Sequence, residues 1–276
     1  MSHLAVHRTL PPDPGTPPAT GPIVWLHGFM GSGRDLGTVA ERLAERTGRT
    51  VLCPDLPGHA ESRQVWPESL ERAADAVLES VEGTPFDLVG YSLGGRVALA
   101  LTARHPEAVG HLILESAHPG IPDIRRRAHR LAADRKASRV LASCHTTTAF
   151  RAFLESWYRS DVFAPDGDPP LDTEQRIAAR LDQDPAMLAR AMMAFSTGIQ
   201  PDWSTLALER VTGYICGARD RKYVEIAHEV FRGEERERVM VVDDAGHTVH
   251  RDAPEAYLDT VCSLLQQAHS NTPCPQ

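Results

Sequence analysis

The sequence lacks long apolar runs, paired cysteine motifs and any excess of positive charge. No stretch approaches the roughly 18 apolar residues of a membrane-spanning helix, and residues 1–10 have no continuous apolar core, so we expect neither a membrane anchor nor export. The 37 Asp and Glu outnumber the 29 Lys and Arg, and the formal charge of −8 argues against nucleic-acid binding.

Cysteines are few, odd in number and without a CxxC pair. Neither a zinc site nor a disulfide framework is therefore indicated, and a reducing cytoplasm is the expected compartment. The five are Cys53, Cys144, Cys216, Cys262 and Cys274, and two of them lie in apolar segments typical of buried strands.

What is present is an alternation of short apolar segments with helical patterns along a 276-residue chain, long enough for one elaborated domain. After a short strand near residues 4–7 and a proline-rich connector at 11–22, strands are predicted at 23–26, 51–53, 86–89, 112–114, 214–216 and 239–242. Helices are predicted around 36–43, 70–81, 95–103 and 225–231, with a last one after Pro254. This order predicts an α/β fold whose parallel sheet is covered on both faces.

Residues 121–202 break the alternation, because helix follows helix without a clear strand. We therefore expect a core of residues 1–120 and 203–276 into which 121–202 is inserted. A helical insertion between two halves of a parallel sheet is expected to lie over the carboxyl ends of the strands, where open α/β sheets bind ligands. The insertion is predicted to act as a cap.

The strongest motif is Gly-Tyr-Ser-Leu-Gly at residues 90–94, between a predicted strand and a predicted helix. In that context Gly-x-Ser-x-Gly is typical of a nucleophile elbow, a sharp turn that projects the serine oxygen above the sheet. A chance glycine turn is the alternative. Ser92 is the predicted catalytic serine.

A serine hydroxyl needs an imidazole to take its proton, and the imidazole needs an acid to fix its tautomer. Asp220 and His247 each follow a late predicted strand, in the order Ser, acid, His that this fold uses. Asp243 and Asp244 are competing candidates for the acid.

Two backbone N–H groups are predicted to form the oxyanion hole. Phe29 lies in the glycine-containing loop after the first central strand, and Leu93 follows the predicted nucleophile. A merely flexible loop is the alternative at Phe29.

Arg96 stands in the first turn of its helix, where a cation opposes the helix dipole. It either extends to solvent or directs its guanidinium at an anionic ligand beside Ser92. The insertion also carries a basic stretch at 121–140, most of which is expected on a solvated helix face.

Together these residues resemble the 2-succinyl-6-hydroxy-2,4-cyclohexadiene-1-carboxylate synthases, menaquinone-pathway lyases with an α/β-hydrolase fold. The resemblance runs from about Ile23 to Leu265. Its motifs are Gly-Tyr-Ser-Leu-Gly-Gly-Arg at 90–96, Leu-His-Gly-Phe-Met-Gly-Ser-Gly at 26–33, Pro-Asp-Leu-Pro-Gly-His at 54–59, His-Pro-Gly-Ile at 118–121, Trp-Tyr at 157–158, Val-Phe-Ala at 162–164, Gln-Pro-Asp at 200–202 and Ala-Gly-His at 245–247.

The resemblance implies a lyase that removes a proton from 2-succinyl-5-enolpyruvyl-6-hydroxy-3-cyclohexene-1-carboxylate and expels pyruvate. It implies that Ser92, Asp220 and His247 act as the base, without metal or organic cofactor. The binding residues that it implies are Arg96, Arg130, Arg180, Tyr91, Trp157 and His27. For Trp157, a core role that ties down the cap is an equal alternative.

Two positions depart from the family pattern: Leu36 replaces a usual Trp, and Ala60 replaces a frequent Gly. Both are expected to affect the pocket and to leave the catalytic groups in place. The expected partner is a small substrate with several carboxylates, with no nucleic acid or membrane, and the chain is expected to be a monomer or a weak homo-oligomer. A serine esterase or carbon–carbon bond hydrolase, or a non-catalytic binding protein on the same fold, are the alternative functions.

Overall fold

The computed structural model describes residues 3–12 and 21–270, so most of the predicted proline-rich connector and Cys274 lie outside the described residues. Within them, seven strands form one sheet in the order β1-β3-β2-β4-β5-β6-β7. All neighbours are parallel except β1, which runs antiparallel to β3 at the edge. The strands are β1 (Val6–Thr9), β2 (Ile23–Leu26), β3 (Val51–Pro54), β4 (Phe86–Tyr91), β5 (Val109–Glu115), β6 (Val211–Gly217) and β7 (Val239–Val242).

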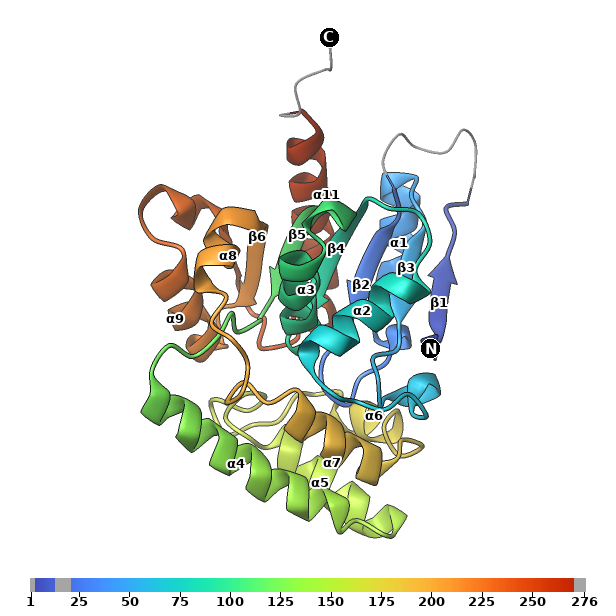
Figure 1. Ribbon diagram of the computed structural model, residues 1–276, viewed down its shortest axis with the longest axis vertical. Coiled ribbons are helices and arrows are strands. Elements are labelled where there is room, and N and C mark those ends of the chain that lie inside the picture. Colours follow the sequence, from blue (N-terminus) through green and yellow to red (C-terminus); the bar gives the residue numbers. More distant parts are fainter. Residues whose placement is uncertain (1–2, 13–20, 271–276) are drawn as a thin grey trace.

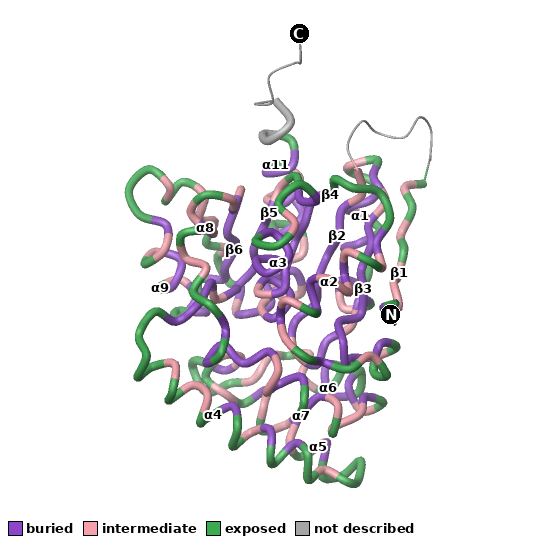
Figure 2. The backbone as a smooth tube through the Cα atoms, in the orientation of Figure 1, coloured by how far each residue is buried: buried purple, intermediate pink, exposed green. Residues whose placement is uncertain are grey.

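Helices cover both faces of the sheet. Side chains alternate between the two faces along each strand, so each strand packs against both helix layers. Val24 and Leu26 pack in one apolar cluster with residues of α2 (Leu70–Ser80), α3 (Leu93–Arg104), α8 (Ser204–Arg210) and α9 (Arg221–Val230). Ile23 and Trp25 pack in a second cluster with α1 (Thr38–Thr47) and α11 (Pro254–Ser270). Figures 1 and 2 show these layers and the buried strands between them, so the predicted fold class is confirmed.

Several elements differ from the sequence-based expectation. The helix expected from residue 36 is interrupted at Gly37, whose φ of 53° ends a 3-10 turn (Gly33–Leu36) before α1 begins. The short helices α8 and α10 (Val249–Asp252) were not predicted, because one or two turns show little periodicity. Further 3-10 turns lie at Ala60–Ser62, Pro106–Ala108 and Gly233–Arg238.

Between β5 and β6 the chain forms α4 (Ile124–Ala142), α5 (Thr147–Tyr158), α6 (Thr173–Ala178) and α7 (Pro185–Ala194). We call these four the inserted helices. Asp123, Thr146 and Asp184 accept backbone N–H hydrogen bonds at the starts of α4, α5 and α7. The helices share their own apolar cluster, and in Figure 1 they lie together beyond one end of the sheet.

In the described part of the chain, no helix is long and apolar enough to cross a membrane. The four cysteines in that part are free thiols, and Cys53 and Cys216 are buried in strands as expected.

Candidate functional site

Ser92 lies in the sharp turn between β4 and α3, with φ 51° and ψ −107°, a conformation that L residues rarely adopt. Two neighbouring glycines make the turn possible. A Cβ on Gly94 would lie 2.1 Å from the Leu26 carbonyl oxygen, and one on Gly90 would lie 2.5 Å from the Cα of Gly95. The motif therefore forms the strained elbow that its sequence predicts.

His247 contacts both Ser92 and Asp220. Its Nε2 lies 3.1 Å from Ser92 Oγ, and its Nδ1 lies 2.6 Å from Asp220 Oδ2. Asp220 lies directly before α9, just after β6, and is 3% exposed, whereas the competing candidates Asp243 and Asp244 are exposed. The structure thus brings the three predicted catalytic side chains into one hydrogen-bonded chain.

Aromatic rings surround the His247 imidazole. The ring centroids of Tyr91, Phe163 and Tyr223 lie 5.4, 5.5 and 4.7 Å from that of His247. The His247 and Asp220 side chains are each 3% exposed, and a charge pair interacts more strongly in such a low-dielectric setting.

The two predicted oxyanion-hole residues occupy the positions that the sequence indicates. Phe29 follows β2 and lines the cavity at Ser92, and Leu93 is the first residue of α3. The N–H groups of a helix's first turn have no acceptor within the helix, so that of Leu93 is available to a ligand.

His27, predicted to bind substrate, is fully buried and does not line this cavity. The Leu56 N–H donates to its Nε2 at 2.9 Å, so its Nδ1 carries the proton and donates to the Gly28 carbonyl at 2.8 Å. Burial lowers the pKa of His27, which keeps the ring neutral. Its observed contacts order the loop that carries Phe29.

A cavity of about 100 Å³ lies beside Ser92 and His247, between the core and the inserted helices. Tyr91 and Trp157 line it as the resemblance implied, and Trp157 also packs against Phe29 at a ring distance of 5.5 Å. Both alternatives for Trp157, ligand contact and attachment of the insertion, are therefore compatible with its position. Among the described residues, no group of three His, Cys, Asp or Glu is arranged to hold a metal ion.

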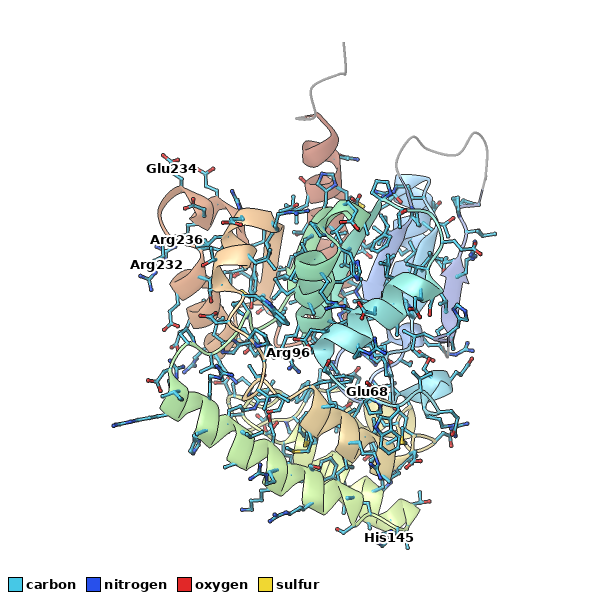
Figure 3. All side chains as sticks on the ribbon, viewed as in Figure 1. Glu68, Arg96, His145, Arg232, Glu234 and Arg236 are labelled. Atoms are coloured by element: carbon cyan, nitrogen blue, oxygen red, sulfur yellow. The ribbon has the colours of Figure 1, made fainter. Side chains whose placement is uncertain are left out.

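Three cations line the same cavity: Arg96, Arg130 and Lys222. Arg130 donates from Nε to both oxygens of Asp134, at 2.8 and 2.9 Å. The Arg96 guanidinium donates to the Phe195 carbonyl, and no carboxylate of the described residues forms an ion pair with it. Burial, reinforced by the charge of Arg130, lowers the pKa of Arg96 to about 10, and it stays cationic at neutral pH. Figure 3 shows Arg96 where α3 faces the inserted helices.

Lys222 was missed by the sequence analysis. Its pKa is lowered by burial and by the neighbouring charge of Arg130, and it lies two residues after Asp220 in the first turn of α9. The signal that singled out Arg96, a cation at the positive end of a helix dipole, was present here as well.

Arg180 is not brought to this cavity. It donates to both oxygens of Asp35, at 3.0 and 2.6 Å, and lines a smaller neighbouring cavity of about 30 Å³. Its Nε is buried without a partner in the described structure. The departures Leu36 and Ala60 do not line the cavity at Ser92 either: Leu36 packs in the core, and the Ala60 N–H donates to Gln183 of the insertion.

Comparison with known proteins gives three findings. Residues 23–260 match the alpha/beta hydrolase family. A 2-succinyl-6-hydroxy-2,4-cyclohexadiene-1-carboxylate synthase from Escherichia coli strain Crooks is 32% identical over 253 residues, which are 88% of this chain and 93% of that protein. The structure of MenH from S. aureus has a TM-score of 0.77 at 24% identity, covering 98% of this chain and 100% of that one.

The fold is also shared with an esterase from Exiguobacterium antarcticum, at a TM-score of 0.71 and 17% identity over 95% of each chain. The reaction must therefore be argued from the groups around Ser92 rather than from the fold.

Proposed function

Because the chain belongs to the alpha/beta hydrolase family and, within it, to the 2-succinyl-6-hydroxy-2,4-cyclohexadiene-1-carboxylate synthases, we propose that it is the lyase of menaquinone biosynthesis. The substrate is 2-succinyl-5-enolpyruvyl-6-hydroxy-3-cyclohexene-1-carboxylate, and the products are pyruvate and 2-succinyl-6-hydroxy-2,4-cyclohexadiene-1-carboxylate. The observation that carries this proposal is the Ser92–His247 contact inside a cavity that also holds three cations.

In this mechanism Ser92, activated by His247 and Asp220, removes the proton next to the succinyl ketone. The proton passes to His247 Nε2, and the C–H electrons form an enolate whose oxygen is held by the N–H groups of Phe29 and Leu93. The enolate then re-forms the ketone as a C2=C3 bond forms, the ring double bond moves from C3=C4 to C4=C5, and the C5–O bond to the enolpyruvyl group breaks. The leaving enolpyruvate takes up a proton and becomes pyruvate.

The cations supply what a substrate with several carboxylates requires. Arg96 has no carboxylate partner of its own in the described structure, so a substrate carboxylate can supply the missing counter-charge. Lys222 adds positive charge to the same cavity, and Arg130 lines it while paired with Asp134, which lines it too. An esterase for neutral substrates has no use for this arrangement, which favours the lyase over an ester or carbon–carbon bond hydrolase.

We further propose that residues 121–202 act as a cap, since their helices supply Arg130 and Trp157 to the cavity. The proposed location is the cytoplasm, the proposed partner is the small anionic substrate, and the triad with its oxyanion hole needs no cofactor for proton abstraction.

Pyruvate release from the proposed substrate tests the function directly. The wild type is expected to release pyruvate, and Ser92→Ala is expected to lose most of this activity because the base is gone. Ser143→Ala, at an exposed serine that ends α4, is the matched control and should behave as wild type. A neutral nitrophenyl ester is assayed in parallel. Rapid Ser92-dependent ester cleavage without pyruvate release would reject the lyase in favour of an esterase.

A further inference from the structure

Arg176 on α6 is a buried arginine that joins the inserted helices to the core, and only 3% of it is exposed. Its Nε donates to Oδ1 of Asp172, the residue that precedes α6, at 2.6 Å. Its two terminal nitrogens donate to core residues: Nη1 to Thr248 Oγ1 at 2.9 Å and Nη2 to Asp252 Oδ1 at 3.0 Å. One guanidinium therefore uses all three of its nitrogens in defined contacts.

The two core partners flank the loop that carries His247. Thr248 is the next residue in the chain, and Asp252 Oδ2 accepts the Gly246 N–H at 2.9 Å, immediately before His247. Arg176 thus holds the loop on both sides of the catalytic histidine.

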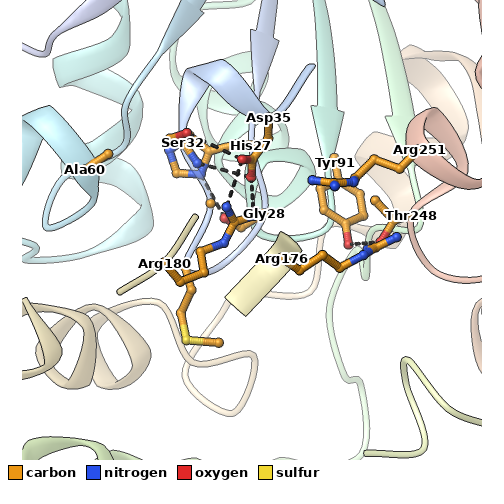
Figure 4. A network of polar contacts seen from close by, with 12 residues as sticks. His27, Gly28, Ser32, Asp35, Ala60, Tyr91, Arg176, Arg180, Thr248 and Arg251 are labelled. Carbon is orange, nitrogen blue, oxygen red and sulfur yellow. Dashed lines mark hydrogen bonds and ion pairs between the residues drawn. The ribbon is translucent and has the colours of Figure 1, made fainter. Parts of the chain in front are cut away.

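The same arginine also reaches the nucleophile elbow. Thr248 Oγ1, which accepts from Arg176, lies 3.0 Å from the Tyr91 hydroxyl, and Tyr91 directly precedes Ser92. Figure 4 shows Arg176, Thr248 and Tyr91 in one line of contacts. Burial raises the pKa of Tyr91 well above its usual value, so the hydroxyl stays neutral and can hydrogen-bond within this line.

We propose that Arg176 is a positioning residue for catalysis, which sets the distance between Ser92 and His247 through Thr248 and Asp252. The Ser92 Oγ to His247 Nε2 contact depends on two separate segments, the elbow after β4 and the loop after β7. Arg176 donates directly to Thr248 and Asp252 in the segment after β7, and it reaches the elbow through the contact between Thr248 and Tyr91. The proton-transfer geometry is therefore complete when α6 is docked on the core. This role rests on the proposed function for its effect on turnover, and on the Ser92–His247 contact alone for its effect on Ser92 reactivity.

Arg176→Gln removes the charge and the paired hydrogen bonds to Thr248 and Asp252 of the core. The expected result is a fall in kcat of about 10- to 100-fold with little change in KM. The geometry of proton transfer is disturbed, whereas the side-chain cations that bind the anionic substrate are unchanged. Arg151→Gln is the matched control. Arg151 pairs with Glu174 of α6 at the surface, far along the chain from the His247 loop, and its loss should leave kcat unchanged.

Labelling of Ser92 by diisopropyl fluorophosphate gives a readout that does not depend on the substrate. The Ser92 oxygen displaces fluoride from phosphorus and its proton passes to His247, so the rate reports their geometry. We expect slower labelling in Arg176→Gln and in Thr248→Val, and a double variant no slower than the worse single one, because both act on one line of contacts. If Arg176→Gln does not fold, Thr248→Val alone decides the point.

Wild-type labelling rates and kcat in both single variants would overturn the proposal. A double variant in which the two losses multiply would also overturn the proposal, because multiplied losses mean that Arg176 and Thr248 act independently. If the wild type labels rapidly but releases no pyruvate, the proposed lyase fails, while the labelling series still decides the role of Arg176.

Discussion

At the scale of single residues, the most informative side chain is Arg96. A cation that is buried beside the nucleophile, without a carboxylate partner in the described structure, is unfavourable in the free protein, as its lowered pKa of about 10 reflects. An anionic substrate supplies the missing counter-charge, so its contact with Arg96 contributes favourably to the binding free energy.

Arg96→Ala is expected to lose about 2–4 kcal/mol of transition-state stabilisation, which is roughly a 30- to 1000-fold fall in kcat/KM for the proposed substrate. The reason is the loss of a desolvated charge-assisted hydrogen bond to a substrate carboxylate. Steady-state assays of pyruvate release measure it, with Arg125→Ala on the exposed face of α4 as the control. An unchanged kcat/KM in Arg96→Ala would reject the carboxylate contact.

Site residues that are positioned by the ends of strands could be predicted from the sequence, and those positioned by packing between the insertion and the core could not. Ser92 and His247 follow strands, and the carboxyl ends of parallel strands converge, so spacing along the sequence was sufficient. The directions of Arg180 and His27 depend on packing between the insertion and the core, which the sequence does not encode locally. Arg180 meets Asp35, 145 residues away, and His27 meets the backbone of Leu56.

At the scale of elements, strands and long helices were predictable because burial on fixed faces gives them a period. β4 and α3 were found for this reason, although both extend by a few residues beyond the predicted limits, into the elbow itself. α8 was not found, since its seven residues hold a single fully buried apolar side chain, Ala207. Short helices of this kind are fixed by tertiary contacts rather than by their own pattern.

Ion pairs of two arginines attach α6 and the residues after it to the core. Besides Arg176, Arg180 follows α6 and pairs with Asp35 of the loop after β2, and the two side chains are 8% and 12% exposed. Burial alone would raise the pKa of Asp35, but the pKa is lowered, and the charge of Arg180 is the largest cause that opposes burial. The carboxylate is therefore charged and depends on its partner.

Arg180→Met is expected to lower the free energy of unfolding by about 3–5 kcal/mol, because it leaves Asp35 charged, buried and unpaired. The double variant with Asp35→Asn should recover much of the loss, since no uncompensated charge remains. Chemical denaturation of the three proteins measures this. A large rise in KM at unchanged stability would instead indicate that Arg180 binds substrate, as the resemblance to the family implied.

At the scale of the whole molecule, the fold holds several histidines in neutral form. Burial lowers the pKa of His59 to about 3, and burial together with Lys222 and Arg96 lowers that of His118 to about 3. His59 is fully buried, its Nδ1 donates to the Pro57 carbonyl at 3.0 Å, and its Nε2 has no partner among the described residues. Among the described residues, no carboxylate lies beside either ring to favour its protonated form.

These histidines predict acid sensitivity with a definite sign. Their pKa values are lower in the folded protein than the ordinary value of 6.5, so the unfolded chain binds protons first as the pH falls. Stability is therefore fully present above about pH 6.5 and is lost progressively between that pH and about 3. Each such histidine contributes up to about 1.4 kcal/mol per pH unit within that window.

Chemical denaturation between pH 7 and 5 isolates this effect, because the carboxylates of the unfolded chain titrate mostly below that range. In His59→Gln, the unfolding free energy should fall less steeply with falling pH, by up to about 1.4 kcal/mol per pH unit. His129→Gln, at an exposed position on α4, should leave the slope as in the wild type. A slope that is the same in all three proteins would contradict a neutral buried His59. A slope lost equally in both variants would place the proton uptake outside the core.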